Sequence, residues 1–237
     1  MFRSFQNYRS FALIVLSLII ASCDREDPGP LQKTRESYSI VDFDRLEMGN
    51  ALQIEVEQAN TFSVEARGDR RNIEDLDVYK RGSTLIIEFD DNGERHHDTY
   101  IYITMPTLES VNFSGASVSK IRGFDSDEDL DLYLSGASVS QLDGLFREVN
   151  AVISGASKLL LFGNGDELNA EVSGASSLKA FDYPVRESTL NVSGASEVKV
   201  SVSDELSVKA GGASSILYRG NPNVTSDTSG GSSVGRD

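Results

Sequence analysis

Residues 151–180 read AVISGASKLLLFGNGDELNAEVSGASSLKA, so the tetrapeptide Ser-Gly-Ala-Ser occurs twice, with its glycines at Gly155 and Gly174. The motif or a close variant recurs between residues 111 and 232 at intervals of 18 to 21 residues. Repetition at a short period is typical of a solenoid, in which a repeat buries its apolar face only against its neighbours. The repeated glycines are Gly115, Gly136, Gly155, Gly174, Gly194, Gly212 and Gly230.

Apolar side chains alternate with polar ones on both sides of each glycine. Ala151 and Ile153 stand before Gly155, and Leu159 and Leu161 follow it in the same alternating phase. Alternation at period two indicates strands with one buried face, so each repeat supplies two short strands. We therefore predict an all-β fold, a parallel β-helix (β-solenoid) of about seven short coils. The crossover rule favours a right-handed coil.

The glycine of each repeat is predicted to form a structural corner, because glycine adopts the backbone of a tight turn without strain. The alanine that follows it, such as Ala175 or Ala195, is small enough to point into that corner. We expect the serines on either side to bond neighbouring backbone groups, or one another across coils. The corners should stack into a ladder of serine and alanine.

Residues 38–108 form a β-rich N-terminal segment that lies outside the repeat register, and residues 109–237 form the repeat solenoid. Within the first segment only residues 71–79 look weakly helical. We predict an irregular N-terminal cap, because an uncovered first repeat would expose an edge ready to pair. The pattern leaves open whether this segment is a separate domain or the first coils. The alternating apolar pairs are Ile54 and Val56, Val64 and Ala66, Leu85 and Ile87, and Ile101 and Ile103.

The N-terminus has the pattern of an export signal. Residues 1–9 carry two arginines and no acid, residues 11–20 are apolar, and small residues precede Cys23. Ten apolar residues are too few to span a bilayer, which needs about 20. The residues before Cys23 resemble a lipobox, so we predict a lipoprotein signal peptide (1–22), lipid attachment at Cys23 and an acidic tether (23–37). The alternative is an ordinary signal peptide, with Cys23 as a leftover thiol. A single cysteine excludes an intrachain disulfide.

The charge of the chain limits its partners. The formal net charge is −15, and it becomes −17 when Arg3 and Arg9 leave with the signal. Binding to nucleic acid or to an anionic membrane needs a positive surface, so neither is expected of the protein body. Membrane attachment is expected through the N-terminal lipid.

Three features could carry chemistry, and each fits a structural role better. The acidic run 125–131 alternates oxygen ligands, but an EF-hand needs glycine and glutamate where Leu130 and Gly136 stand. His96 and His97 would point to opposite faces of a strand, so they could not easily share a metal. The repeats contain no histidine and no Gly-x-Ser-x-Gly elbow for an active serine. We predict no catalytic residue, no metal site and no cofactor.

A binding surface is the remaining candidate site. Lys120, Lys179 and Lys199 each stand five residues after their glycine, and the last two belong to consecutive repeats. We predict a cationic binding strip from Lys179 and Lys199; the alternative is outward-facing strand lysines that discourage edge pairing. The aromatic residues of the repeats share no register. A sugar site would have to be local, built from Phe181 and Tyr183.

The chain resembles a bacterial family called the putative auto-transporter adhesin head domain, or GIN domain. The resemblance covers roughly residues 38–235 and rests on the lipobox, on the tandem Ser-Gly-Ala-Ser repeats and on three segments. It implies a β-helical body on an exported lipoprotein, and an adhesin. The segments are Phe43-Asp44-Arg45-Leu46, Ile54-Glu55-Val56 and Ile103-Thr104-Met105-Pro106-Thr107-Leu108.

These observations predict a non-enzymatic, lipid-anchored protein of the cell envelope, specifically an outer-membrane lipoprotein that binds a glycan or a surface protein. The alternative is a polysaccharide lyase or hydrolase, because parallel β-helices host such enzymes, which is an analogy from fold alone. A purely structural envelope component is the third hypothesis. Acids from 125–131, or other acids, gathered in a concave face with Lys179 or Lys199 would favour the enzyme.

Overall fold

The computed structural model describes residues 29–90 and 95–237, and residues 31–237 form one compact unit. The predicted signal peptide and Cys23 lie outside the described residues. Within the described ranges, no helix combines the length and the apolar character needed to cross a membrane.

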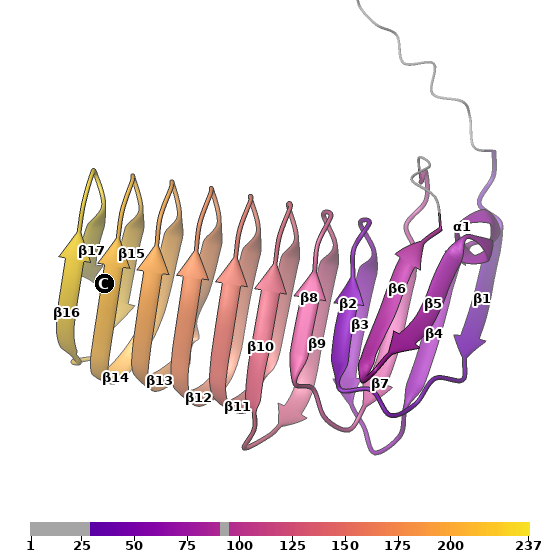
Figure 1. The fold of residues 1–237 in the computed structure, drawn as a ribbon, viewed down its shortest axis with the longest axis horizontal. Coiled ribbons are helices and arrows are strands. Elements are labelled where there is room, and N and C mark those ends of the chain that lie inside the picture. The colour runs from indigo at the N-terminus through magenta and orange to yellow at the C-terminus, as the bar shows by residue number, and fades with distance from the viewer. Residues whose placement is uncertain (1–28, 91–94) are drawn as a thin grey trace, which may run out of the picture. The chain divides into compact units, whose positions relative to one another are not determined.

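All strands join one 17-stranded sheet that winds into a β-solenoid (Figure 1). The strand segments that precede the corner glycines stack in parallel on one side, which we call the pre-glycine face. The segments that follow the glycines stack in parallel on the other side, the post-glycine face. The predicted parallel β-helix with two strands in each coil is confirmed.

The pre-glycine face contains β2 (Arg45–Met48), β8 (Ser110–Phe113), β10 (Asp129–Leu134), the second halves of β11 (Val139–Ile153), β12 (Lys158–Val172), β13 (Ser177–Val192) and β14 (Glu197–Ala210), and β16 (Asn223–Thr228). The post-glycine face contains β3 (Gln53–Gln58), β9 (Val118–Asp125), the first halves of β11 to β14, β15 (Ser215–Arg219) and β17 (Ser233–Arg236).

The seven repeat glycines lie in turns, with φ between +61° and +79°. The parallel ladder continues through these turns, because the N–H of Ala175 donates to the carbonyl oxygen of Gly155 at 2.8 Å. A Cβ on Gly155 would lie 2.4 Å from the carbonyl oxygen of Gly136 in the previous coil. Glycine is therefore required for two reasons: its positive backbone angle, and the close approach of the previous coil.

The expectation that the corner alanine points inward is wrong. Ala175 and its counterparts are exposed, whereas the second serine of each of the first six motifs is at most 2% exposed. The left-handed glycine turns the Gly-Ala pair outward, and the serine then enters the core. Its hydroxyl can be buried because it finds a local partner: Ser138 Oγ donates to the Ser135 carbonyl and Ser196 Oγ to the Ser193 carbonyl, both at 2.8 Å.

A second bend closes each coil on the side away from the glycine corner, and aromatic rings fill it in several coils. Phe124 and Phe146 stack there with ring centroids 6.2 Å apart. Tyr183 is fully buried at the same bend, beside Gly165, whose missing side chain leaves room for the phenol ring. Burial raises the pKa of Tyr183 to about 12. The sequence did not predict this inner aromatic stack.

The N-terminal segment supplies both coils and a cap. β2 pairs in parallel with β6 (Thr84–Phe89) on one side and with β8 on the other, and β3 lies likewise between β7 (Tyr100–Met105) and β9. Residues 45–58 are thus a coil of the solenoid, inserted between β6–β7 and β8–β9. Its corner is Gly49-Asn50-Ala51, in which Asn50 and Ala51 have φ of +57° and +59°.

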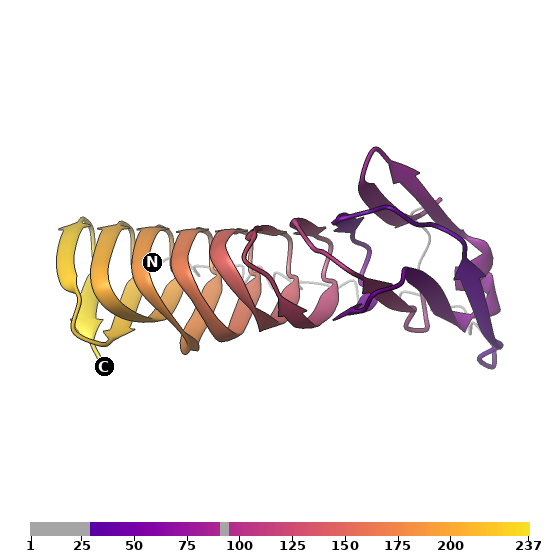
Figure 2. The same cartoon turned by 90° about the horizontal axis from the view of Figure 1, so that it is seen from below.

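The cap extends the sheet beyond β6 and β7 with antiparallel strands (Figure 2). β4 (Ser63–Asp69) pairs with β7, β1 (Lys33–Tyr38) pairs with β4, and β5 (Leu76–Arg81) pairs with β6. Residues 33–37 therefore belong to a strand, so the predicted tether boundary at residue 37 is wrong. The weakly helical stretch contains one turn, α1 (Arg70–Glu74), before β5 begins.

Candidate binding surfaces

The post-glycine face carries a basic and aromatic patch on its outer side, formed by Lys158, Leu160, Phe162, Lys179, Phe181 and Lys199. Lys179 and Lys199 are paired in register on β13 and β14, and Leu160 on β12 pairs with Lys179. A hollow of 170 Å³ lies between these side chains, and it is lined by Leu160, Phe162, Phe181, Lys179 and Lys199 together with the carboxylate-bearing Asp182. The apolar residues of this basic–aromatic patch are half-buried.

The lysines of the patch act on one neighbouring acid. Lys199 Nζ lies 2.8 Å from Glu197 Oε1. The pKa of the Glu197 carboxyl is lowered, chiefly by the hydrogen bond from Lys199 and further by the charges of Lys179 and Lys158. Within the described part of the chain, neither Lys158 nor Lys179 has a carboxylate at ion-pair distance. These two ammonium groups are therefore available to an anionic partner.

The patch differs from the predicted strip in its members. The sequence indicated Lys179 and Lys199, but not Lys158, Leu160 or Phe162, which stand in the preceding coil. The register Lys120–Gln141–Leu160–Lys179 shows that Lys120 lies in the same row, separated from Lys179 by two other coils. Aligning all repeats on their glycines, in place of searching for lysine alone, would have found Leu160 in that row.

The structure does not bring Phe181 and Tyr183 together into one local sugar site. These residues stand on either side of the bend in β13, where Tyr183 points into the core and has no exposed surface. Phe181 stays on the outer side and is partly covered by Arg219, whose guanidinium carbon lies 3.9 Å from the ring centroid. Arg219 is held in turn by Asp237 at 2.8 Å. Only Phe181 belongs to the patch.

The acidic run 125–131 does not gather around one point. Asp125 ends β9, whereas Asp129 and Asp131 begin β10 on the pre-glycine face, where Arg147 pairs with Asp129. In the described ranges no cluster of three or more histidine, cysteine or acidic side chains could hold a metal ion. The acids of β10 and the lysines of the patch lie on different faces. The acids beside those lysines are Glu197, which pairs with Lys199, and Asp182, which lines the hollow.

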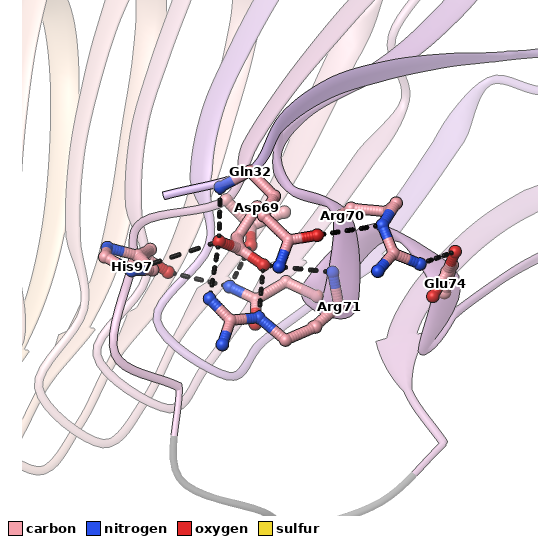
Figure 3. A network of polar contacts seen from close by, with 8 residues as sticks. Gln32, Asp69, Arg70, Arg71, Glu74 and His97 are labelled. Atoms are coloured by element: carbon pink, nitrogen blue, oxygen red, sulfur yellow. Dashed lines mark hydrogen bonds and ion pairs between the residues drawn. The ribbon is translucent and has the colours of Figure 1, made fainter. Parts of the chain in front are cut away.

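His97 lies beside a polar network in the cap (Figure 3). His96 is exposed, whereas His97 Nε2 lies 3.9 Å from Asp69 Oδ2. The buried Asp69 carboxylate accepts hydrogen bonds from Arg71 Nε at 2.7 Å, from the Arg71 N–H at 3.0 Å and from the Gln32 N–H at 2.9 Å. The Arg71 hydrogen bond is the main reason that the pKa of Asp69 lies well below its usual range. The network fastens the start of β1 to α1.

The stacked coils and the open patch define a β-solenoid with candidate binding surfaces on its outer faces. Residues 42–222 match the family described as "Putative auto-transporter adhesin, head GIN domain", and the chain belongs to this family. A comparison with curated proteins gave no match.

Several solved structures share the fold. A "putative adhesin" from Parabacteroides merdae matches with a TM-score of 0.71 at 17% identity, covering 87% of this chain and 96% of that one. A "putative adhesin" from Bacteroides fragilis gives 0.74 at 17% identity, with 86% and 96% covered. A "putative lipid binding protein" from Parabacteroides distasonis gives 0.69 at 17% identity, with 87% and 97% covered. At this identity the likeness shows the fold alone.

Proposed function

We propose that the chain is a non-enzymatic, lipid-anchored adhesin of the cell envelope that binds an acidic glycan through the basic–aromatic patch. The observation that carries this proposal is the pair Lys179 and Lys199 on adjacent strands, which lines one hollow together with Phe162 and Phe181, while Lys158 stands on the preceding coil outside the hollow. The family and the structural neighbours named as adhesins support a role at the cell surface.

The spacing and chemistry of the patch suit a repeating anionic polymer. Neighbouring parallel strands lie about 4.8 Å apart, so lysines on adjacent strands can meet successive carboxylates or sulfates of one chain. Phe162, Phe181 and Leu160 offer apolar surface against which the non-polar face of a sugar ring can pack. On a protein with a net charge of −15, this local positive surface would orient an acidic partner toward one side of the solenoid.

The anchor part of the proposal rests on Cys23 and the residues before it. A diacylated N-terminal cysteine would hold the exported protein at the outer membrane, because stable anchoring takes more than one acyl chain. Replacing Cys23 by Ser should move the protein from the detergent-extracted membrane fraction to the soluble fraction. A Cys23→Ser variant that remains bound to membranes would contradict the anchor.

The binding part is tested with the chain from residue 23 onward, unlipidated through Cys23→Ser. Its binding to immobilised alginate and heparin is compared with that of a Lys179→Ala/Lys199→Ala variant and of a Lys120→Ala control, which removes a lysine from the same row outside the patch. We expect saturable, salt-sensitive binding that the double variant loses and the control keeps. Binding lost equally in the control, or absent for every acidic glycan tested, would refute the patch as the site.

A further inference from the structure

The pre-glycine face contains a second hollow, a groove of 580 Å³ that crosses β10 to β14. We propose that this groove binds an uncharged oligosaccharide lying across the coils. Six of its side chains carry the argument: Tyr133, Asn150, Asn169, Thr189, Asn191 and Ser207. The groove lies on the opposite set of strand segments from the basic–aromatic patch, so it is a separate site with different chemistry.

Beneath the groove, the inward-facing side chains of adjacent strands form one register row, and the smallest of them stand at its centre. The register runs Leu132, Ala151, Ala170, Leu190, so two alanines stand between two leucines. Ala151, Ala170 and Leu190 also line the groove. Because a packed interior leaves few voids, small inner residues allow the strands above them to lie closer to the core. The groove is thus a feature of the folded backbone as well as of its surface side chains.

One wall of the groove is a row of amides whose orientation is fixed. Asn169 Nδ2 donates to Asn150 Oδ1 at 3.3 Å, and to the carboxylates of Glu148 and Glu167 at 3.0 Å each. Asn150 Nδ2 donates in turn to Asp131 Oδ1 at 3.4 Å. Groups held in this way lose little conformational freedom when a ligand binds, which favours affinity.

The strand segments of β13 and β14 at the groove carry polar side chains without hydrogen-bond partners in the described ranges. The side chains of Thr189, Asn191 and Ser207 form no hydrogen bond with other side chains or backbone groups in the described ranges. Thr189 and Ser207 are neighbours in one register row, in line with Asn150 and Asn169. Hydroxyls and amides both donate and accept, which is the pairing that the hydroxyl groups of a sugar require.

An aromatic ring ends the groove at β10. Tyr133 is 43% exposed, and its partner in the register, Val152, is also exposed. A flat ring beside hydrogen-bonding groups suits the apolar face of a pyranose, because ligand sites combine apolar contact area with a few oriented polar groups. Tyr133 is therefore the expected stacking residue.

Charge decides which oligosaccharides fit. Asp129, Glu148, Glu167, Glu187 and Glu205 occupy one register row on five adjacent strands, and Glu167 of this row lines the groove together with Glu171 and Lys209. Parallel strands bring such carboxylates within about 5 Å of one another, so this row repels a polyanion. The same carboxylates accept hydrogen bonds from uncharged hydroxyl groups. Lys209 offsets only part of this negative charge, so we expect an uncharged glycan to fit the groove better than the acidic glycans that the basic–aromatic patch attracts.

Titration calorimetry with the unlipidated chain tests this site, using cellohexaose, maltohexaose, mannohexaose and a chitosan hexamer as probes. We expect at least one uncharged hexasaccharide to bind. Its affinity should fall at least tenfold in Tyr133→Ala and in Asn191→Ala. Tyr100→Ala is the matched control, since Tyr100 is 42% exposed in the cap, and it should bind normally.

The outcomes separate this site from the basic–aromatic patch. Lys179→Ala/Lys199→Ala should keep the uncharged ligand, and Tyr133→Ala should keep alginate. Failure of every uncharged hexasaccharide to bind, binding of the cationic hexamer alone, or an affinity unchanged in Tyr133→Ala would each overturn the groove proposal. None of these results would contradict alginate binding at the lysines of the basic–aromatic patch. Conversely, a failure to bind alginate would not contradict the groove proposal.

Discussion

Gly155 and Gly174 lie one above the other in adjacent coils, so close that a Cβ on Gly174 would stand 2.4 Å from the carbonyl oxygen of Gly155. The same oxygen accepts the 2.8 Å hydrogen bond from the N–H of Ala175. The corner therefore has no room for a side chain on the glycine, whatever the space outside the solenoid.

Substituting Gly174 by Ala should destabilise the fold by about 3–4 kcal/mol. A non-glycine residue in the left-handed region costs roughly 1–2 kcal/mol, and the contact with Gly155 must add to this. Gly82→Ala is the control, since Gly82 has φ of +63° but a Cβ added there would meet no atom within 4 Å. Urea unfolding measures both, and equal losses for the two variants would show that the close approach of the coils contributes nothing.

The corrected corner predicts opposite effects for two adjacent residues. Ala175→Leu should change the free energy of unfolding by no more than about 0.5 kcal/mol, because Ala175 is exposed. Ser176→Leu should cost at least about 1–3 kcal/mol, because Ser176 is 2% exposed and a larger side chain would overpack the core. Thermal melting of the two variants measures both changes. A larger loss of stability in Ala175→Leu than in Ser176→Leu would show that the alanine points inward after all.

Asp69→Asn should reduce stability near neutral pH and should flatten its acid dependence. The folded state lowers the pKa of Asp69, so the ionised carboxylate favours folding above the unfolded pKa of about 3.9. This contribution is lost as the pH falls through the folded pKa. Urea midpoints of the variant and the parent should therefore differ at pH 7 and converge in strong acid.

The control for this substitution is Asp77→Asn, which neutralises an exposed aspartate on β5. Because Asp77 is exposed on the surface, the urea midpoint of this variant at pH 7 should lie close to that of the parent. An Asp69→Asn variant with the parent's stability at pH 7 would mean that the network joining β1 to α1 contributes nothing measurable.

The repeat made the solenoid predictable, because each coil repeats the same local pattern and the stacking needs no other information. The orientation at the corner was harder. Counting the apolar alternation from the alanine after each glycine gives the wrong orientation. The residue that is in phase with the buried positions is the second serine. Ser176, Leu178 and Ala180 are all buried, so an unbroken period of two from the serine would have predicted the inward hydroxyl.

The first coil and the groove were not predictable in the same way. The corner Gly49-Asn50-Ala51 lacks the Ser-Gly-Ala-Ser motif, and its asparagine takes a backbone angle that glycine takes elsewhere. The groove depends on Ala151 and Ala170 being neighbours under outward-facing polar side chains. That proximity follows from the register of coils with unequal lengths, which a single sequence does not specify.

The insertion of β2 and β3 between later strands also constrains how the protein assembles. A chain delivered from its N-terminus presents residues 45–58 before either neighbour of that coil exists, because β6 and β8 follow much later. This coil can complete its hydrogen bonds only after residue 122 has arrived, whereas each repeat after it finds the previous one already in place. The N-terminal end can therefore assemble only after these later strands have been delivered. The remaining coils can stack one by one in the order of their synthesis.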